Sequence, residues 1–91
     1  MDSPSYTVAF SRAARRRLAK LPESAVAALI EHLMGPVASN PHQLGKLLEK
    51  PLNGVWSTRR GEYRALYIIN DTEHLVTVIA VDHRRDVYRP R

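Results

Sequence analysis

The stretch of sequence that decides the fold is Gly54-Val55-Trp56-Ser57-Thr58-Arg59-Arg60-Gly61-Glu62-Tyr63-Arg64-Ala65-Leu66-Tyr67-Ile68-Ile69-Asn70. Its β-branched and aromatic residues predict two short strands joined by a turn at Gly61. Side chains alternate between the two faces of a strand, so Arg59 and Arg60 are expected to point opposite ways. An unpaired buried guanidinium is costly, and sheet interiors normally select apolar residues. These arginines and Arg64 therefore need a partner: an ion pair, a second protein or a phosphate.

Further elements are expected on both sides of this hairpin. The pattern predicts a strand over residues 6–10, a helix over 12–21, a second helix from Pro22 to about Met34, and a loop over 39–51. The apolar run 75–81 predicts a central strand that is covered on both faces. We expect one α+β domain over residues 1–91, with a loose arm at 1–5, two N-terminal helices packed on one face of a mainly antiparallel sheet, and a short C-terminal tail.

Composition restricts the class of protein. The chain has 91 residues, a net charge of +5 and no cysteine, which excludes a disulfide framework and thiolate metal sites. No apolar run approaches the roughly 20 residues of a membrane span, and the N-terminus does not resemble a signal peptide, so a cytoplasmic protein is expected. The arginine-rich charge favours a polyanion such as nucleic acid, or an acidic protein partner.

The expected first helix is strongly basic outside its apolar stripe. Ala14, Leu18 and Leu21 form that stripe, and the other sides carry Arg12, Arg15, Arg16, Arg17 and Lys20. A solvated basic face is the favoured interpretation over a dedicated binding surface. His32 lies beside the apolar stripe of the second helix and is expected to be structural or superficial, because no second metal-binding residue has a matching offset. The acids show no ligand spacing either, so neither a metal nor a cofactor is predicted.

The polar groups suit cleavage of an RNA backbone without a metal ion. If the last three strands are neighbours, three segments converge, joined by Tyr88 and a loop lysine: Arg59-Arg60, Arg64 and His83-Arg84. The reaction needs a base for the 2′-OH, cations for the phosphorane and an acid for the leaving oxygen. His83 suits the acid, the arginines suit the phosphate, and Tyr88 suits stacking. Three alternatives stay open: Arg64 pairs with Asp82 or Glu62, His83 is structural, and Tyr88 is a core anchor.

Three motifs in this order resemble the RelE/ParE superfamily of bacterial toxins, on the RelE side: residues 18–22 (Leu-Ala-Lys-Leu-Pro), residues 54–67, and residues 81–88 (Val-Asp-His-Arg-Arg-Asp-Val-Tyr). The resemblance covers residues 6–89. It implies a compact microbial-RNase-like fold and metal-independent cleavage of mRNA in the ribosomal A site, where ribosomal RNA is also contacted. It further implies inhibition by a cognate antitoxin, and operator DNA binding only through the toxin–antitoxin complex, which represses its own operon.

The resemblance also implies roles for individual residues. Arg64 matches the strand arginine that contacts the scissile phosphate, and Arg84 matches the arginine assigned to protonate the leaving group. His83 matches the histidine of the YoeB branch, and Tyr88 matches the C-terminal tyrosine.

This chain departs from the family at the general base. The RelE type member has a lysine pair on the strand that here spans residues 55–58, and this chain has none. The YoeB branch uses a loop glutamate, for which Lys46 and Glu49 are the nearest candidates, so the base is unassigned. Arg59, Arg60 and Lys46 are expected to bind RNA or phosphate. The alternatives are a ParE-like gyrase-inhibiting toxin, or a weakly active toxin that acts mainly as an antitoxin-bound transcriptional co-repressor.

Overall fold

The computed structural model describes residues 5–85 and 87. Its elements are β1 (Thr7–Phe10), α1 (Arg12–Leu18), α2 (Glu23–His32), the π-helical segment η1 (Leu33–Val37), α3 (Pro41–Leu44), β2 (Lys46–Leu47), β3 (Trp56–Arg60), β4 (Tyr63–Asn70) and β5 (Leu75–His83). The strands form one five-stranded sheet in the order β1-β5-β4-β3-β2. Only β1 and β5 pair in parallel; the other pairs are antiparallel. The predicted α+β architecture is therefore confirmed.

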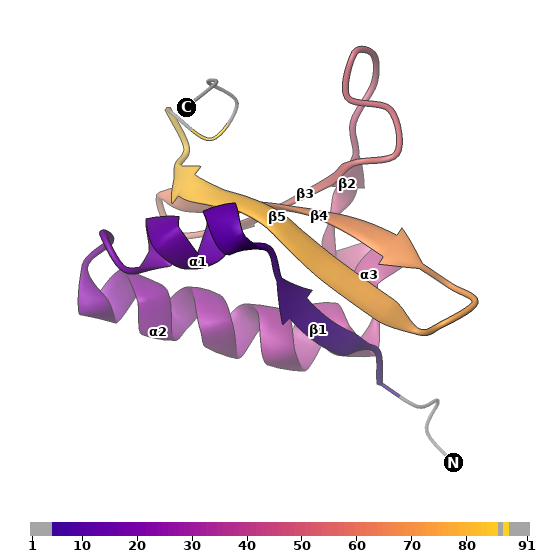
Figure 1. Cartoon of the computed structure of the whole chain (residues 1–91), viewed down its shortest axis with the longest axis horizontal. Coiled ribbons are helices and arrows are strands. Elements are labelled where there is room, and N and C mark those ends of the chain that lie inside the picture. The colour runs from indigo at the N-terminus through magenta and orange to yellow at the C-terminus, as the bar shows by residue number, and fades with distance from the viewer. Residues whose placement is uncertain (1–4, 86, 88–91) are drawn as a thin grey trace.

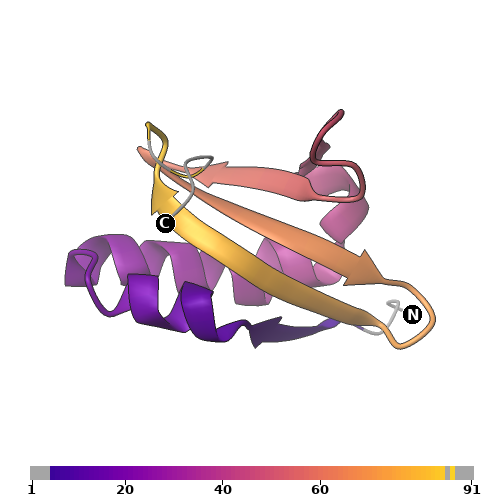
Figure 2. The same ribbon diagram turned by 45° about the horizontal axis from the view of Figure 1, so that its top comes forward.

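The helices α1 and α2 lie together against one side of the sheet, while none of the described residues forms a helix on its opposite side (Figures 1 and 2). The core between these layers combines helix residues with alternate residues of β4 and β5, and its fully buried members include Leu29, Leu33, Ala65, Tyr67 and Val78. Burial of such side chains is the main stabilising contribution to a domain of this size. The apolar run 75–81 forms an interior strand, β5, which lies between β1 and β4, although the middle strand of the five is β4. The expected cover on both faces is not found among the described residues, because the helices lie on one side of the sheet.

The predicted end of the second helix near Met34 is wrong. The helical backbone continues through η1, with Pro36 inside it, and both Leu33 and Val37 are completely buried. Proline lacks an N–H and breaks an ordinary α-helix. Here the backbone widens into a π-helical turn around Pro36, and the burial of Leu33 and Val37 at the two ends of η1 holds this turn against the core. The first helix ends at Leu18, three residues earlier than predicted, and Pro22 caps α2 instead of beginning it.

The predicted loop over 39–51 contains two elements. Pro41 begins α3, a position where its missing N–H costs nothing. Lys46 and Leu47 then pair with Ser57 and Trp56 as the short edge strand β2. The sheet consequently has a fifth strand that the sequence pattern did not predict, because a two-residue strand has no readable period.

Buried polar contacts tie α3 to the sheet. The Tyr67 hydroxyl donates to the Pro41 carbonyl at 2.6 Å, and burial raises the pKa of Tyr67 to about 12. The Thr58 hydroxyl donates to the Leu44 carbonyl at 3.0 Å and accepts from His32 Nε2 at 2.8 Å. Burial, and then the charge of Arg60, lower the pKa of His32. His32 is therefore a structural residue that joins α2 to β3, as the sequence indicated.

A second polar cluster lies at the turn between β4 and β5. The Tyr6 hydroxyl donates to Asp71 Oδ1 at 2.6 Å, and His42 Nε2 lies 3.2 Å from the same carboxylate. The hydrogen bond from Tyr6 lowers the pKa of Asp71, and that contact raises the pKa of Tyr6. The Tyr6 ring also stacks on His74 with ring centroids 4.5 Å apart. This cluster holds α3, the turn and the segment before β1 together.

Of the parts of the chain that the structure describes, no helix has the length and apolar character needed to cross a membrane. The predicted arm at 1–5, except Ser5, lies outside the described residues, as does the C-terminal tail beyond Val87.

Candidate active site

The register of β3, β4 and β5 places two arginines opposite each other on the face of the sheet that carries no helix. Arg59 of β3 pairs with Arg64 of β4, and Arg64 in turn pairs with Asp82 of β5. The alternating residues Ala65 and Tyr67 are fully buried toward the helices, so Arg59 and Arg64 belong to the opposite face, here called the open face. Like charges that are directly opposite destabilise a sheet. This arrangement therefore has a cost that an anion would remove.

Arg64 is half-buried, and among the residues that the structure describes it forms no ion pair. The alternative that Arg64 forms an ion pair with Asp82 or Glu62 is not what the structure has, although Asp82 is its register partner. Asp82 Oδ1 instead accepts a hydrogen bond from Arg17 Nη2 of α1 at 2.9 Å. Glu62 Oε1 lies 2.7 Å from Arg84 Nε. Each nearby acid thus has its own arginine, and Arg64 keeps its charge available.

Lys46 lies in the next row of the open face. It pairs with Ser57, which pairs with Leu66 of β4. Ser57 is two residues from Arg59, about 7 Å along the strand. The structure therefore brings the predicted lysine to the same face as the two opposed arginines. Lys46 is held there by its pairing in β2 and does not lie in the loop that the sequence indicated.

Glu49 is placed elsewhere. The Leu48 N–H donates to the Val55 carbonyl at 2.9 Å, and Glu49 follows as an exposed residue of the loop between β2 and β3. Val55 precedes Arg59 by four residues, or about 13 Å of strand. The structure does not bring Glu49 beside Arg64, and its role as a base remains a prediction.

His83 and Arg84 lie at the end of β5 beside the β3–β4 turn. His83 pairs with Tyr63 in register, and the two rings meet edge to face with centroids 5.5 Å apart. The Arg85 N–H donates to His83 Nδ1 at 3.3 Å, so a neutral ring carries its proton on Nε2, which lies 4.0 Å from Glu62 Oε1. The Arg84 N–H donates to the Glu62 carbonyl at 2.8 Å. Tyr88, the last predicted site residue, lies outside the described residues.

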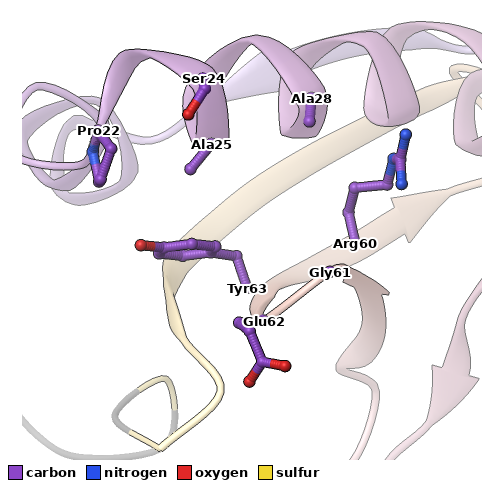
Figure 3. Close-up of a pocket in the computed structure, with 8 residues that line it drawn as sticks. All are labelled: Pro22, Ser24, Ala25, Ala28, Arg60, Gly61, Glu62 and Tyr63. Atoms are coloured by element: carbon purple, nitrogen blue, oxygen red, sulfur yellow. The ribbon is translucent and has the colours of Figure 1, made fainter.

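Arg60 is separated from Arg59, as the alternation predicts. It pairs with Tyr63 on the helix-covered face. Figure 3 shows Arg60 and Tyr63 directed toward α2 and Glu62 turned away from it. They line a pocket of about 280 Å³, formed by Pro22, Ser24, Ala25, Ala28, Arg60, Gly61, Glu62 and Tyr63. Arg60 therefore does not share the face of Arg59 and Arg64, and its predicted contact with RNA remains a prediction.

Within the described residues, no group of three histidine, cysteine or acidic side chains has the geometry to hold a metal ion. Sequence reasoning missed Arg17, which it assigned to the solvated basic face of the first helix. The signal was present: Arg17 is three residues after Ala14 and four before Leu21, so it borders the buried stripe of the helix. Arg17 is half-buried, whereas the other arginines of α1 are exposed.

Comparison with known proteins agrees with this architecture. A family model described as "ParE toxin of type II toxin-antitoxin system, parDE" matches residues 8–88. The chain belongs to the RelE/ParE family of type II toxins. Within that family it is similar to "Toxin RelE" of Mycobacterium tuberculosis, with 44% identity over 88 residues that cover 97% of this chain and 91% of the relative. "Toxin RelG" of the same organism is 46% identical over 84 residues, which cover 92% and 97%.

Solved structures give the same result. The toxin–antitoxin complex RelBE2 from M. tuberculosis contains a chain with 44% identity and a TM-score of 0.86, over 89% of this chain and 100% of that chain. The intact E. coli RelBE toxin–antitoxin complex matches with a TM-score of 0.73 and 21% identity, over 87% and 96%, and shows a shared fold alone. The resemblance to the RelE side of the superfamily, read from the motifs, is confirmed.

Proposed function

We propose that this toxin is a metal-independent, ribosome-dependent mRNA endonuclease. The observation that carries the proposal is the direct opposition of Arg59 and Arg64 on the open face, where no acid among the described residues neutralises either arginine. Two opposed guanidinium groups are unfavourable in the free protein and favourable around a phosphate, which each can contact through two N–H donors. Similarity to toxins named RelE supports the same chemistry.

The proposed reaction is attack of a ribose 2′-oxygen on the adjacent phosphorus. A P–O bond to the 2′-oxygen forms, the P–O bond to the 5′-oxygen breaks, and the products are a 2′,3′-cyclic phosphate and a 5′-hydroxyl. One proton leaves the 2′-OH and one reaches the leaving oxygen. Arg59 and Arg64 stabilise the extra negative charge of the phosphorane, which is the largest contribution expected in such a site.

Position favours Lys46 over Glu49 as the group that interacts with the 2′-OH, because Lys46 lies on the open face in the row next to Arg59. His83 and Arg84 are the candidates for the acid, but His83 pairs in register with Tyr63 on the helix-covered face, so the register does not bring it to the face of Arg64. Both contact Glu62 in the free protein, so substrate must compete with Glu62 for either side chain. The proposed dependence on the ribosome is compatible with this arrangement, since the ribosome would present the phosphate at the correct place.

We propose further that a cognate antitoxin neutralises the toxin. A chain that is 44% identical has been crystallised in a toxin–antitoxin complex, and the net charge of +5 favours an acidic partner. Contacts with operator DNA would then pass through the antitoxin, as the sequence resemblance implies.

The test is induced expression in a host, followed by primer extension on a translated mRNA. Wild type should give cuts within codons that require translation. Arg64→Ala should reduce these cuts about 100-fold or more, the usual effect of losing one transition-state donor. Arg16→Ala, which removes an exposed charge from α1, is the matched control and should leave them unchanged. Growth arrest with DNA damage and no cuts would instead support gyrase inhibition, the alternative within the superfamily. No arrest would support a co-repressor.

A further inference from the structure

Asp82 is a negative charge inside a face that is otherwise arranged to attract an anion. Its carboxylate is almost completely buried, and its strand position is directly opposite Arg64. Residues paired across an antiparallel sheet have Cβ atoms about 4.5–5.5 Å apart, well within the reach of an arginine side chain. In isolation, this pair of residues would form an ion pair, and the phosphate would then have to displace Asp82.

Arg17 prevents this. Its Nη2 donates to Asp82 Oδ1 at 2.9 Å, and the same oxygen accepts the His83 N–H at 2.8 Å. Arg17 is about two-thirds buried, with 32% of its side chain exposed. Ion pairs that are shielded from water are stronger and less sensitive to salt than surface pairs. The contact therefore determines where the Asp82 carboxylate points.

The placement of Arg17 follows from the start of α1. The Ser11 hydroxyl accepts the Ala14 N–H at 3.1 Å as the helix N-cap, and Ala14 is completely buried. Arg17 comes about one helical turn after Ala14, where α1 runs along β5 beyond the end of β1 (Figure 1). A basic side chain from the helix layer can thus reach a carboxylate on the sheet at its edge.

We infer that Arg17 is a positioning residue for RNA cleavage: it holds Asp82 away from Arg64, so that Arg64 remains free to bind the scissile phosphate. Through Asp82 it also fixes the backbone at His83, where the segment with the candidate acids begins. The inference rests on the proposed function. A positioning role of Arg17 differs in one consequence from a purely structural role in joining α1 to β5. Loss of Arg17 is harmful because the charged Asp82 carboxylate then lies across the sheet from Arg64 without the Arg17 contact, so neutralising Asp82 should repair the defect.

The activity test uses the purified full-length toxin and ribosomes programmed with mRNA, under single-turnover conditions with toxin in excess. Arg17→Ala should lower the maximal cleavage rate about 10- to 100-fold, the range for losing a hydrogen bond to a charged group. Asp82→Asn keeps an oxygen for the His83 N–H and should stay within about threefold of wild type. The double variant Arg17→Ala/Asp82→Asn should recover to the level of Asp82→Asn. Arg16→Ala is the control for loss of charge on α1.

Thermal denaturation of each variant separates positioning from stability. A structural contact alone predicts that the double variant cleaves no better than Arg17→Ala. That result, or an Arg17→Ala variant with the wild-type rate, would overturn the inference.

A crystal structure of Arg17→Ala decides the question independently of catalysis. We expect an Arg64 guanidinium nitrogen within 4 Å of an Asp82 carboxylate oxygen, the ordinary limit for an ion pair. An Arg64 side chain that still forms no ion pair with Asp82 would refute the inference even if every variant lost activity. Conversely, a wild-type chain that never cuts mRNA would refute the proposed function. The crystal structure of Arg17→Ala would still show whether Arg17 keeps Asp82 away from Arg64.

Discussion

The opposed pair Arg59–Arg64 should make the free toxin less stable than a variant that lacks one of the charges. Arg59→Thr removes a cation that lies directly across from Arg64 and introduces a residue that favours strands. Cβ atoms of directly opposed residues lie about 5 Å apart. For guanidinium groups at about 6 Å, Coulomb's law in water gives about 0.7 kcal/mol of repulsion. Physiological salt, with a Debye length of about 8 Å, roughly halves this energy.

Arg59→Thr should therefore raise the free energy of unfolding by about 0.3–0.7 kcal/mol. For a domain of this length, that corresponds to an increase in Tm of about 1–5 °C. The increase should fall to a few tenths of a degree in 1 M salt, where the Debye length is about 3 Å. The assay is thermal unfolding followed by circular dichroism at three salt concentrations. Lys46→Thr is the control, because Lys46 faces the uncharged Ser57 across its strand pair.

The same variant tests the link to phosphate. Inorganic phosphate at millimolar concentration should raise the Tm of wild type more than that of Arg59→Thr, since a ligand stabilises the state that binds it. A variant that is less stable than wild type, or whose gain persists in 1 M salt, would show that the two arginines do not repel each other. Repulsion between Arg59 and Arg64 would then no longer support an anion site on the open face.

Two further changes test the packing behind the site. Tyr67→Phe should lower the free energy of unfolding by about 1–3 kcal/mol, because the Pro41 carbonyl loses its donor. The folded pKa of Tyr67, about 12, lies above its ordinary value of 10, so this contribution is intact below pH 10. It should be lost as the pH rises through 12, by about 2–3 kcal/mol in total. Denaturant titrations at pH 9 and 11.5 should show that wild type loses more stability between these pH values than Tyr67→Phe. An equal loss in both proteins would contradict the prediction. Gly45→Ala should destabilise by about 1–3 kcal/mol, because its Cβ would overlap the Tyr67 hydroxyl. Gly35→Ala, which meets no atom within 4 Å, is its control, and equal Tm values for the two would contradict this packing.

The sequence predicted the parts of the fold that have a readable period. Alternation across residues 56–70 is long enough to fix both strands and the faces of Arg59 and Arg64, and the apolar run of β5 marks an interior strand of the sheet. The π-helical segment, α3 and β2 are too short for a period, and proline and glycine in this region indicate a loop. Tertiary contacts decide them: Leu33 and Val37 are buried, and the hydroxyls of Tyr67 and Thr58 bind α3 carbonyls. No local pattern contains that information.

The chemistry of the candidate site was predictable by residue type but not by partner. The sequence indicated that Arg64 needs a partner and named Asp82 and Glu62, the two nearest acids. Which arginine each acid binds depends on the register and on how α1 docks, and a shift of one residue moves every side chain to the other face. The structure pairs Asp82 with Arg17 and Glu62 with Arg84. Alternation could identify the face, whereas only the assembled sheet identifies the ion pairs.

These ion pairs suggest why a basic toxin carries two acids so close to its proposed phosphate site. Asp82 and Glu62 flank Arg64 but bind other arginines, so each acid positions a cation or a strand end without neutralising Arg64. The cost is an open face whose arginines repel each other when no anion is bound. An acidic antitoxin segment or an RNA phosphate would relieve that repulsion equally well. On the proposed function, the feature that would bind the substrate is the same feature that would bind an inhibitor, and competition between the two would follow from one pair of opposed side chains.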